Sequence, residues 1–415
     1  MSHPTPTPPK GLRGLLAIVG PGLVVAATGV GAGDMVAAGK AGASFGLVVL
    51  WAALWGTVLK FVLAEGVARY QLATGETILE GWVAAFGKPL HAFFSVYLVM
   101  WSFIVAAALM SGCGLAAHAL VPALSVKAWG ILHSLVALLV VWVGRYSFFE
   151  NTMKIAVAVM FVAIVGSAAI QQPDLHTTLT GLVHPHIPAG GTVLLLGVMG
   201  GVGGTLTLLS YNYWLAEKGW RGPEWMQGVR FDLGVGYALT GVFGLGLMIL
   251  AAVVLHPQGI EIAGSKGILE LAAILGDKFG RAGEIVFLVG FWGAVATSTL
   301  GVWQGVPYLF ENYVQLLRRE KPAHKASSKT YRGYLLFLAL PPMLLLFMDR
   351  PVWLVVAYAA VGSLFMPFLA ATLLVLNNRK NMGVLKNGWL ANGFLVLSLG
   401  LFLYLMVNQL KEKVF

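Results

Sequence analysis

The chain has 415 residues, of which 58% are hydrophobic and only 11% are charged, and its formal net charge is +10 at pH 7. Soluble domains carry about 25% charged residues, so this composition excludes an ordinary soluble protein and indicates an all-α, polytopic membrane protein. Apolar runs that reach the roughly 20 residues of a membrane-spanning helix predict eleven spans, at 11–38, 44–68, 92–121, 128–144, 152–170, 192–214, 233–255, 284–312, 333–348, 352–376 and 389–409.

The amino-terminal stretch, MSHPTPTPPKG, is rich in proline and has neither a basic leader nor a cleavage site. We expect residues 1–12 to form a short disordered cytoplasmic tail rather than a signal peptide. With this end inside, most loop lysines and arginines fall on the cytoplasmic side, including RREKPAHKASSKTYR at 318–332. This bias predicts a multi-pass protein of the inner cell membrane with its C-terminus outside. Basic charge facing anionic lipid accounts for the net charge, so the expected partner is the lipid bilayer and not nucleic acid.

Two glycine clusters interrupt apolar spans. TGVGAGDMVAAG, at 28–39, lies in the first span, and GVMGGVGGTLT, at 197–207, lies in the sixth. Glycine destabilises a helix interior by roughly 1 kcal/mol relative to alanine, and paired glycine-interrupted segments in the two halves of a chain are typical of inverted-repeat transporters. The clusters therefore predict two helices that unwind in mid-membrane around a shared cavity. Close packing of intact helices through small residues is the alternative, but Asp34 favours a functional site, because an acid inside a bilayer is costly.

Three further features have simpler interpretations. Lys60 and Glu65 lie towards the cytoplasmic end of the second span, where we expect a pair that snorkels to the interface. The HPH triplet at 184–186 has a possible metal-ligand spacing, but a solvated external loop is the preferred interpretation. The segment GILELAAILGDKF, at 267–279, has helical spacing of its apolar residues and predicts a short extracellular surface helix.

Several stretches resemble the Nramp (natural resistance-associated macrophage protein) family. They are IVGPGLVVAATGVGAGDMVAAGKAGASFG at 18–46, ARYQLATGET at 68–77, GVMGGVGGTLTLLSYNYW at 197–214, WGAVATSTLGVWQG at 292–305 and SLFMPF at 363–368. The resemblance implies a LeuT-type fold of two inverted five-helix repeats plus an eleventh helix, with the first and sixth helices broken. On this scheme the repeats cover 13–190 and 191–380, and the eleventh helix lies in 381–415. The resemblance also implies proton-coupled uptake of divalent transition metals.

The chain departs from the family pattern at the metal ligands. Counted from Gly20 and Pro21, the family's first-helix motif Asp-Pro-Gly-Asn falls on Gly31, Ala32, Gly33 and Asp34. The sixth-helix motif, an alanine followed by Met-Pro-His, falls on Gly201, Gly204, Thr205 and Leu206. The resemblance therefore indicates a divergent member that has kept the scaffold and lacks the usual metal ligands.

The predicted substrate site combines the glycine breaks with nearby polar residues, and Asp34 is its expected metal ligand. Its members are Thr28, Gly31, Asp34, Gly201, Gly204, Thr205, Tyr211 and Gln304. No methionine or histidine faces this centre on the alignment, so its oxygen donors favour a transported cation that is hard or hydrated, such as Mg²⁺. A small polar organic solute, moved without metal or proton coupling, is the alternative. We expect no cofactor and no enzyme activity, because the chain has no HExxH motif and no nucleophile with a convincing base. A sensor or a non-transporting relic is a further alternative.

Overall fold

The computed structural model describes residues 6–144, 146–201, 203–262, 264–320, 328–348 and 351–414, and the regular elements in these ranges are helical. A helix satisfies its backbone hydrogen bonds internally, which a segment inside lipid requires. The helices are α1 (Gly11–Ile18), α2 (Pro21–Gly29), α3 (Ala32–Phe45), α4 (Leu50–Thr74), α5 (Ile78–Phe86), α6 (Lys88–Leu120), α7 (Val126–Val143), α8 (Tyr146–Ile170), α9 (Leu175–Val183), α10 (Thr192–Gly201), α11 (Tyr211–Glu217), α12 (Met226–Val254), α13 (Gly264–Leu317), α14 (Lys329–Ala339), α15 (Pro351–Leu376) and α16 (Trp389–Val414). Short 3₁₀ helices are η1 (Gly46–Val49), η2 (Leu206–Ser210), η3 (Pro223–Trp225), η4 (His256–Gln258), η5 (Pro341–Met348) and η6 (Lys380–Leu385).

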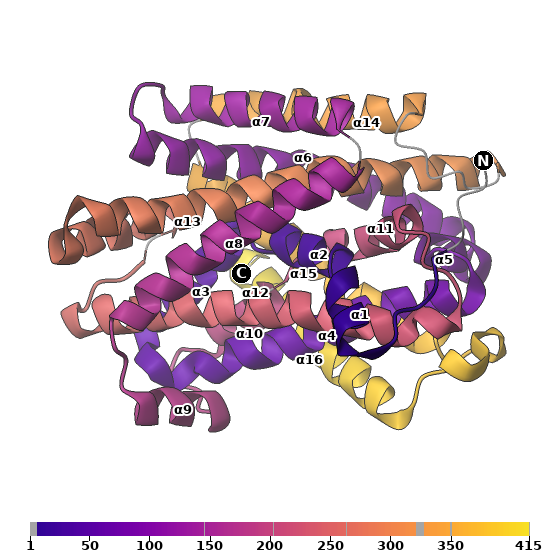
Figure 1. The fold of residues 1–415 in the computed structure, drawn as a ribbon, viewed down its shortest axis with the longest axis horizontal. Helices are drawn as coiled ribbons and strands as arrows, with labels where there is room; N and C mark the ends of the chain where they lie inside the picture. The colour runs from indigo at the N-terminus through magenta and orange to yellow at the C-terminus, as the bar shows by residue number, and fades with distance from the viewer. Residues whose placement is uncertain are drawn as a thin grey trace.

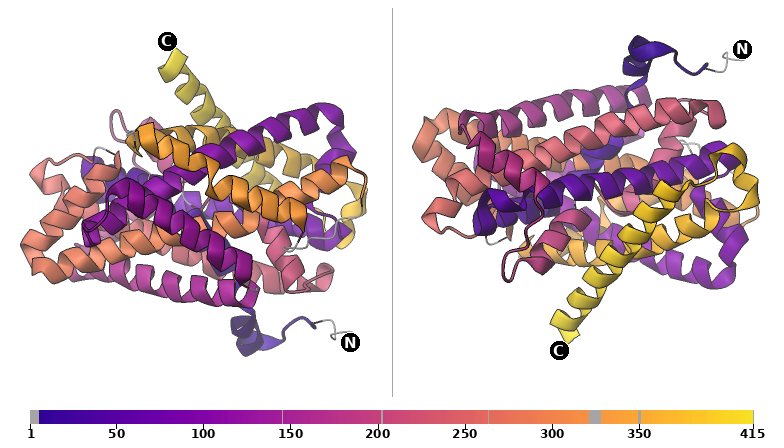
Figure 2. Two further views of the ribbon diagram at one scale, coloured as in Figure 1. Left: turned by 90° about the horizontal axis from the view of Figure 1, so that it is seen from above. Right: turned by 90° about the horizontal axis from the view of Figure 1, so that it is seen from below.

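The long helices form one bundle. Figure 1 shows α4, α6, α7, α12 and α13 running roughly parallel along the long axis, with α5 and α11 near one end and α9 near the other. In both views of Figure 2, α1 and α16 project from opposite sides of this bundle. Helix α12 packs against α2, α3, α4 and α8, so it lies beside both halves of the first segment.

The described helices support a multi-pass membrane protein. Seven of them are long and apolar enough to cross a membrane, or eight when α1 and α2, bent by 49° to each other, count as one span. This length criterion does not count the broken sixth segment, and it treats 365–376 and 389–404, within the tenth and eleventh predicted spans, as shorter apolar helices. The ninth predicted span consists of α14 followed by η5, because Pro341 and Pro342 cannot continue an α-helix. The repeat boundaries at 190 and 380 and the orientation across the membrane stay predictions.

The first and sixth segments are both interrupted, as the glycine clusters predict. Helix α2 ends at Gly29, and α3 begins at Ala32 after two non-helical residues. Helix α10 ends at Gly201, and residues 203–205 are non-helical before η2 and α11 continue the segment. Gly203 and Gly204 have φ angles of +87° and +84°, which residues other than glycine rarely adopt. The alternative of intact helices that only pack closely is therefore wrong.

The predicted extracellular helix at 267–279 forms the first part of α13. Gly280, with φ 71° and ψ −179°, is non-helical within this element and separates the first part from the eighth span. Such a conformation ends the helical hydrogen-bond ladder at one residue and allows the chain to change direction. The segment is confirmed as helical, and its location outside the membrane stays a prediction.

Candidate functional site

The two interrupted segments meet at their breaks. A Cβ atom at Gly29 would lie 2.4 Å from the carbonyl carbon of Gly203, and a Cβ atom at Gly204 would lie 3.1 Å from the Cα of Gly29. Helix α13 approaches the same place, because a Cβ atom at Gly301 would fall 1.8 Å from Thr28 Oγ1. The glycines thus have two roles: they permit the unwound backbone, and they allow three segments to touch at the centre of the bundle.

Hydroxyl groups of α13 satisfy the backbone oxygens that the first break leaves free. Ser298 Oγ donates a hydrogen bond to the Val30 carbonyl at 2.8 Å and lies 3.3 Å from the Ala27 carbonyl. Thr297 Oγ1 also lies 3.3 Å from the Ala27 carbonyl. Both side chains are buried. Because an unpaired carbonyl in a bilayer is costly, these hydroxyls stabilise the unwound conformation.

The carbonyls of the second break are also hydrogen-bonded, and one of them binds a charged group. Lys60 Nζ, from the middle of α4, donates to the carbonyl oxygen of Gly204. Tyr237 Oη donates to the carbonyl of Gly203 at 3.4 Å, and Trp101 Nε1 donates to Thr205 Oγ1 at 3.3 Å. The carbonyls of Val30, Gly203 and Gly204 therefore each accept a hydrogen bond from a side chain of a neighbouring helix, and the Ala27 carbonyl lies 3.3 Å from two hydroxyls.

The prediction that Lys60 and Glu65 form a snorkelling pair is wrong. Lys60 is fully buried, and its ammonium lies 5.7 Å from the centre of the Phe402 ring. Glu65 instead forms ion pairs with Arg69 and with Arg230, the latter at 2.9 Å. Residues three or four apart share a helix face, whereas these two are five apart. Lys60 therefore faces the broken sixth segment, and Glu65 faces a different neighbour.

Asp34 lies in the first turn of α3, beside the first break. Its Oδ2 accepts a hydrogen bond from the Gly31 backbone nitrogen at 2.9 Å, so the carboxylate caps the helix that begins there. Lys60 interacts electrostatically with Asp34. The two residues bring one acid and one amine to the region where the two breaks meet.

A small cavity of about 20 Å³ opens beside Asp34. This is space for roughly one water molecule. The polar groups in its wall are those of Asp34, Thr240 and the unwound backbone, whereas the other side chains are apolar. The wall consists of Val30, Asp34, Met35, Ala38, Gly203, Thr240, Phe243, Gly244 and Leu247. The expectation that no methionine faces this centre is wrong for Met35, which is buried and is one of the residues that line this cavity.

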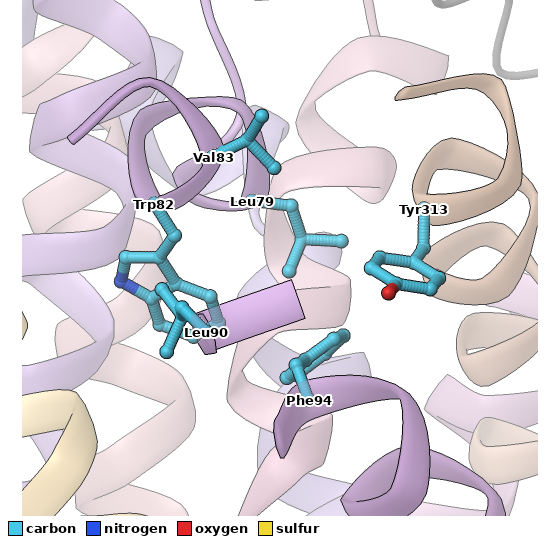
Figure 3. A pocket seen from close by; sticks show the side chains of 6 residues that line it. All are labelled: Leu79, Trp82, Val83, Leu90, Phe94 and Tyr313. Atoms are coloured by element: carbon cyan, nitrogen blue, oxygen red, sulfur yellow. The ribbon is translucent and has the colours of Figure 1, made fainter. Parts of the chain in front are cut away.

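A second small cavity is apolar and differs in character. Figure 3 shows its lining, which comes from α5, α6 and α13 and consists of Leu79, Trp82, Val83, Leu90, Phe94 and Tyr313. Its volume is about 10 Å³, and the Tyr313 hydroxyl is hydrogen-bonded to Ser95. No acid or base lines this space, so it does not rival the Asp34 cavity as a site for an ion.

Six of the eight predicted site residues lie in or next to the two breaks. They are Thr28, Gly31, Asp34, Gly201, Gly204 and Thr205. Tyr211 donates its hydroxyl hydrogen to Asp232 at 2.8 Å, and Gln304 accepts a hydrogen bond from Trp214. Of the eight, Asp34 is the one that lines the described wall of the Asp34 cavity. Tyr211 follows the break by six residues, a rise of roughly 10 Å in α or 3₁₀ geometry, which carries it towards the neighbouring end of the bundle.

Asp232, in α12, is a buried acid that the sequence analysis did not single out. Its Oδ1 accepts a hydrogen bond from the Gly20 nitrogen at 2.8 Å, and its Oδ2 accepts from the Gly22 nitrogen at 2.6 Å. Oδ2 also accepts the Tyr211 bond. A carboxylate at the N-terminal end of a helix satisfies free N–H groups and interacts favourably with the helix dipole. The sequence signal that could have identified it is the position of this acid at the start of the seventh predicted span. Its partners on α2 could not be predicted, because they are remote in sequence.

The described residues offer few conventional metal ligands. They contain no group of three or more His, Cys, Asp or Glu side chains placed to hold a metal ion. Near the HPH triplet, Asp174 caps α9 by accepting a hydrogen bond from the Thr177 nitrogen at 2.7 Å, and the His186 carbonyl accepts one from Trp51. A divalent ion at the two breaks would have the Asp34 carboxylate, backbone carbonyls, hydroxyls and the Met35 thioether as possible donors.

Comparison with known proteins identifies the family. The model of the family described as natural resistance-associated macrophage protein-like matches residues 22–411. The chain belongs to this family. A divalent metal cation transporter, MntH, of Chromohalobacter salexigens is 25% identical over 303 residues, which cover 70% of this chain and 69% of that protein. A Klebsiella pneumoniae protein of the same name is 25% identical over 59% of this chain and 60% of its own length.

Solved structures confirm the fold class. The manganese transporter of Eremococcus coleocola, in complex with an aromatic bis-isothiourea substituted compound, matches with a TM-score of 0.82 at 16% identity, over 98% of this chain and 90% of that one. MhsT in complex with L-phenylalanine matches with a TM-score of 0.60 at 15% identity, over 93% of this chain and 97% of that one. The fold of this Nramp-family member is therefore LeuT-type, as the resemblance implied.

Proposed function

We propose that this protein is a secondary-active membrane transporter whose substrate passes between the broken first and sixth segments by alternating access. The observation that carries the proposal is the meeting of the two breaks around Gly29 and Gly203, with the Asp34 carboxylate in the adjoining cavity. Unwound backbone at membrane depth is tolerated only where protein buries it or a cavity adjoins it. The basic run at 318–332 supports insertion in the inner membrane with the N-terminus in the cytoplasm.

A divalent metal cation is the first candidate substrate, because the related proteins of Chromohalobacter salexigens and Klebsiella pneumoniae are divalent metal cation transporters. Carboxylate, carbonyl and hydroxyl oxygens favour a hard ion that keeps part of its water, such as Mg²⁺. The Met35 thioether in the same wall would favour a softer ion. Comparing transport of Mn²⁺ with transport of Mg²⁺ therefore tests which of these donors determines the preferred ion.

Ion flux into proteoliposomes tests this function. We expect the purified wild-type protein to move Mg²⁺ or Mn²⁺. The Asp34→Asn variant should transport the ion at least about tenfold more slowly, because Asp34 is the acidic residue in the described cavity wall and its negative charge would offset that of the ion. Asp174→Asn is the matched control, since this exposed acid caps α9 far along the chain. Equal rates for wild type and Asp34→Asn would show that the site is misplaced. Wild-type vesicles that move neither ion would refute divalent-metal transport.

A small polar organic solute is the second candidate, and Lys60 is the observation that favours it. The Lys60 ammonium already binds the Gly204 carbonyl and attracts Asp34, so the site contains a positive charge before any substrate enters. A neutral or zwitterionic solute is not repelled as a divalent ion is. Calorimetric titration of the purified protein with a divalent-ion panel and with a panel of amino acids and sugars distinguishes the two. Heat from the organic panel alone would favour the second candidate.

A further inference from the structure

We propose that Lys60 is a specificity-determining residue that acts as a built-in cation in the substrate site and weakens the binding of divalent metal ions. This proposal rests on the proposed function, because it concerns the same site. Lys60 belongs to α4, outside both broken segments, and no motif of the glycine clusters includes it. Its role follows from the groups that surround its ammonium.

The surroundings of Lys60 hold its side chain in one place. Its side chain is fully buried, and its Cβ lies 3.5 Å from the position that a Cβ atom on Gly203 would occupy. The ammonium donates to the Gly204 carbonyl and lies 5.7 Å from the centre of the Phe402 ring, which belongs to α16. A carbonyl oxygen and an aromatic face are both groups that bind cations. The protein therefore provides a cation site and fills it with its own side chain.

Lys60 changes the charge of the site as well as its occupancy. The Asp34 carboxylate is the acidic group in the described wall of the cavity, and its charge is opposite to that of Lys60. The two side chains together carry no net charge. A divalent ion that loses water needs negative charge to offset its own, and here the carboxylate is already balanced. The ion would also have to displace the ammonium before it used the Gly204 oxygen.

Removing the ammonium should therefore expose a carboxylate and a carbonyl to external cations. We expect Lys60→Gln and Lys60→Met to bind Mg²⁺ or Mn²⁺ at least about tenfold more tightly than the wild type does. Lys60→Arg keeps the charge and should bind these ions as weakly as the wild type. Lys40→Met is the matched control, because it removes the same charge from an exposed position on α3. The Asp34→Asn/Lys60→Gln double variant should lose the gain.

The measurement is isothermal titration of the detergent-purified full chain with MgCl₂ and MnCl₂, together with the shift in melting temperature that each salt produces. A ligand that binds only the folded state stabilises it by RT ln(1 + L/Kd), where L is the free ligand concentration, and so raises the melting temperature. A variant of low stability therefore still gives a reading. A larger ion-induced shift in Lys60→Gln and Lys60→Met than in wild type, Lys60→Arg and Lys40→Met supports the proposal.

Three results would overturn it. They are equal or weaker ion binding by Lys60→Gln, an equal gain in Lys40→Met, and a gain that persists in the double variant. Flux through the wild-type protein separates this failure from a failure of the proposed function. If wild-type vesicles move divalent ions but Lys60→Gln binds them no better, the role of Lys60 is wrong and divalent-metal transport stands. If wild-type vesicles move no divalent ion but Lys60→Gln binds one tightly, the role of Lys60 stands and divalent-metal transport is wrong.

Discussion

Replacing Asp232 with asparagine is expected to loosen the N-terminal end of α2. The carboxylate accepts hydrogen bonds from the Gly20 nitrogen at 2.8 Å, from the Gly22 nitrogen at 2.6 Å and from the Tyr211 hydroxyl at 2.8 Å. An asparagine amide has one acceptor oxygen in place of two. Its better orientation keeps the Gly22 and Tyr211 bonds and turns the NH₂ group towards the Gly20 N–H, which then has no acceptor.

The magnitude follows from the bond that is lost. A hydrogen bond to a charged group contributes about 1.5–3 kcal/mol, so local opening of α2 should become easier by at least about 1.5 kcal/mol. At 1.36 kcal/mol per tenfold change, the amide exchange rate of residues 20–29 should rise about 10- to 100-fold. Hydrogen–deuterium exchange with mass spectrometry on the protein in nanodiscs measures this rate. Exchange in α8 should stay the same.

Two further variants control this experiment. Tyr211→Phe removes one donor and leaves both backbone bonds of Asp232 in place, so exchange in α2 should rise less than in Asp232→Asn. Asp174→Asn makes the same chemical change at the cap of α9, where asparagine is also a good N-cap, and should leave α2 unchanged. Wild-type exchange across residues 20–29 in a folded Asp232→Asn protein would refute the conclusion that this carboxylate holds α2 in place.

The contact between the breaks and the hydroxyl support of the first break give two more predictions. Gly29→Ala should lower stability by roughly 1–3 kcal/mol through overpacking and abolish flux, because its Cβ would lie 2.4 Å from the backbone of the sixth segment. Gly197→Ala, whose Cβ meets nothing within 4 Å in α10, should be neutral or stabilise by up to about 1 kcal/mol. Equal melting temperatures for these two variants would contradict the packing argument. Ser298→Ala leaves the Val30 carbonyl without its 2.8 Å bond and should cost about 1–3 kcal/mol, again measured by thermal melting; an unchanged melting temperature would show that another group satisfies the carbonyl.

Much of the fold could be predicted because its causes are local in the chain. A run of about 20 apolar residues has one favourable state in lipid, which is a helix. Clusters of glycine lower the cost of leaving that helix, and the non-helical residues 30–31 and 203–205 lie within these clusters. The acid Asp34 indicated a candidate site because an acid inside a bilayer is costly and is a functional hypothesis by default.

The sequence analysis failed where the role of a side chain depends on which groups the folded protein places next to it. Lys60 lies near Glu65 in sequence, which predicts a pair that snorkels to the membrane interface, but the packing of α4 places its ammonium against a carbonyl of the sixth segment. The role of Asp232 depends on its hydrogen bonds from the Gly20 and Gly22 nitrogens, which are 212 and 210 residues away along the chain. Met35 enters the cavity through the rotation of α3, which a spacing of residues does not specify.

Apolar length and glycine content thus decide where this chain forms helices and where it breaks them, because both act through backbone hydrogen bonds within a few residues. The partners of Lys60, Asp34 and Asp232 arise only when helices from distant parts of the chain pack together. Buried charges are stable only with a partner, and a partner is a matter of distance in space. The charge of the candidate substrate site is for this reason a property of the folded bundle.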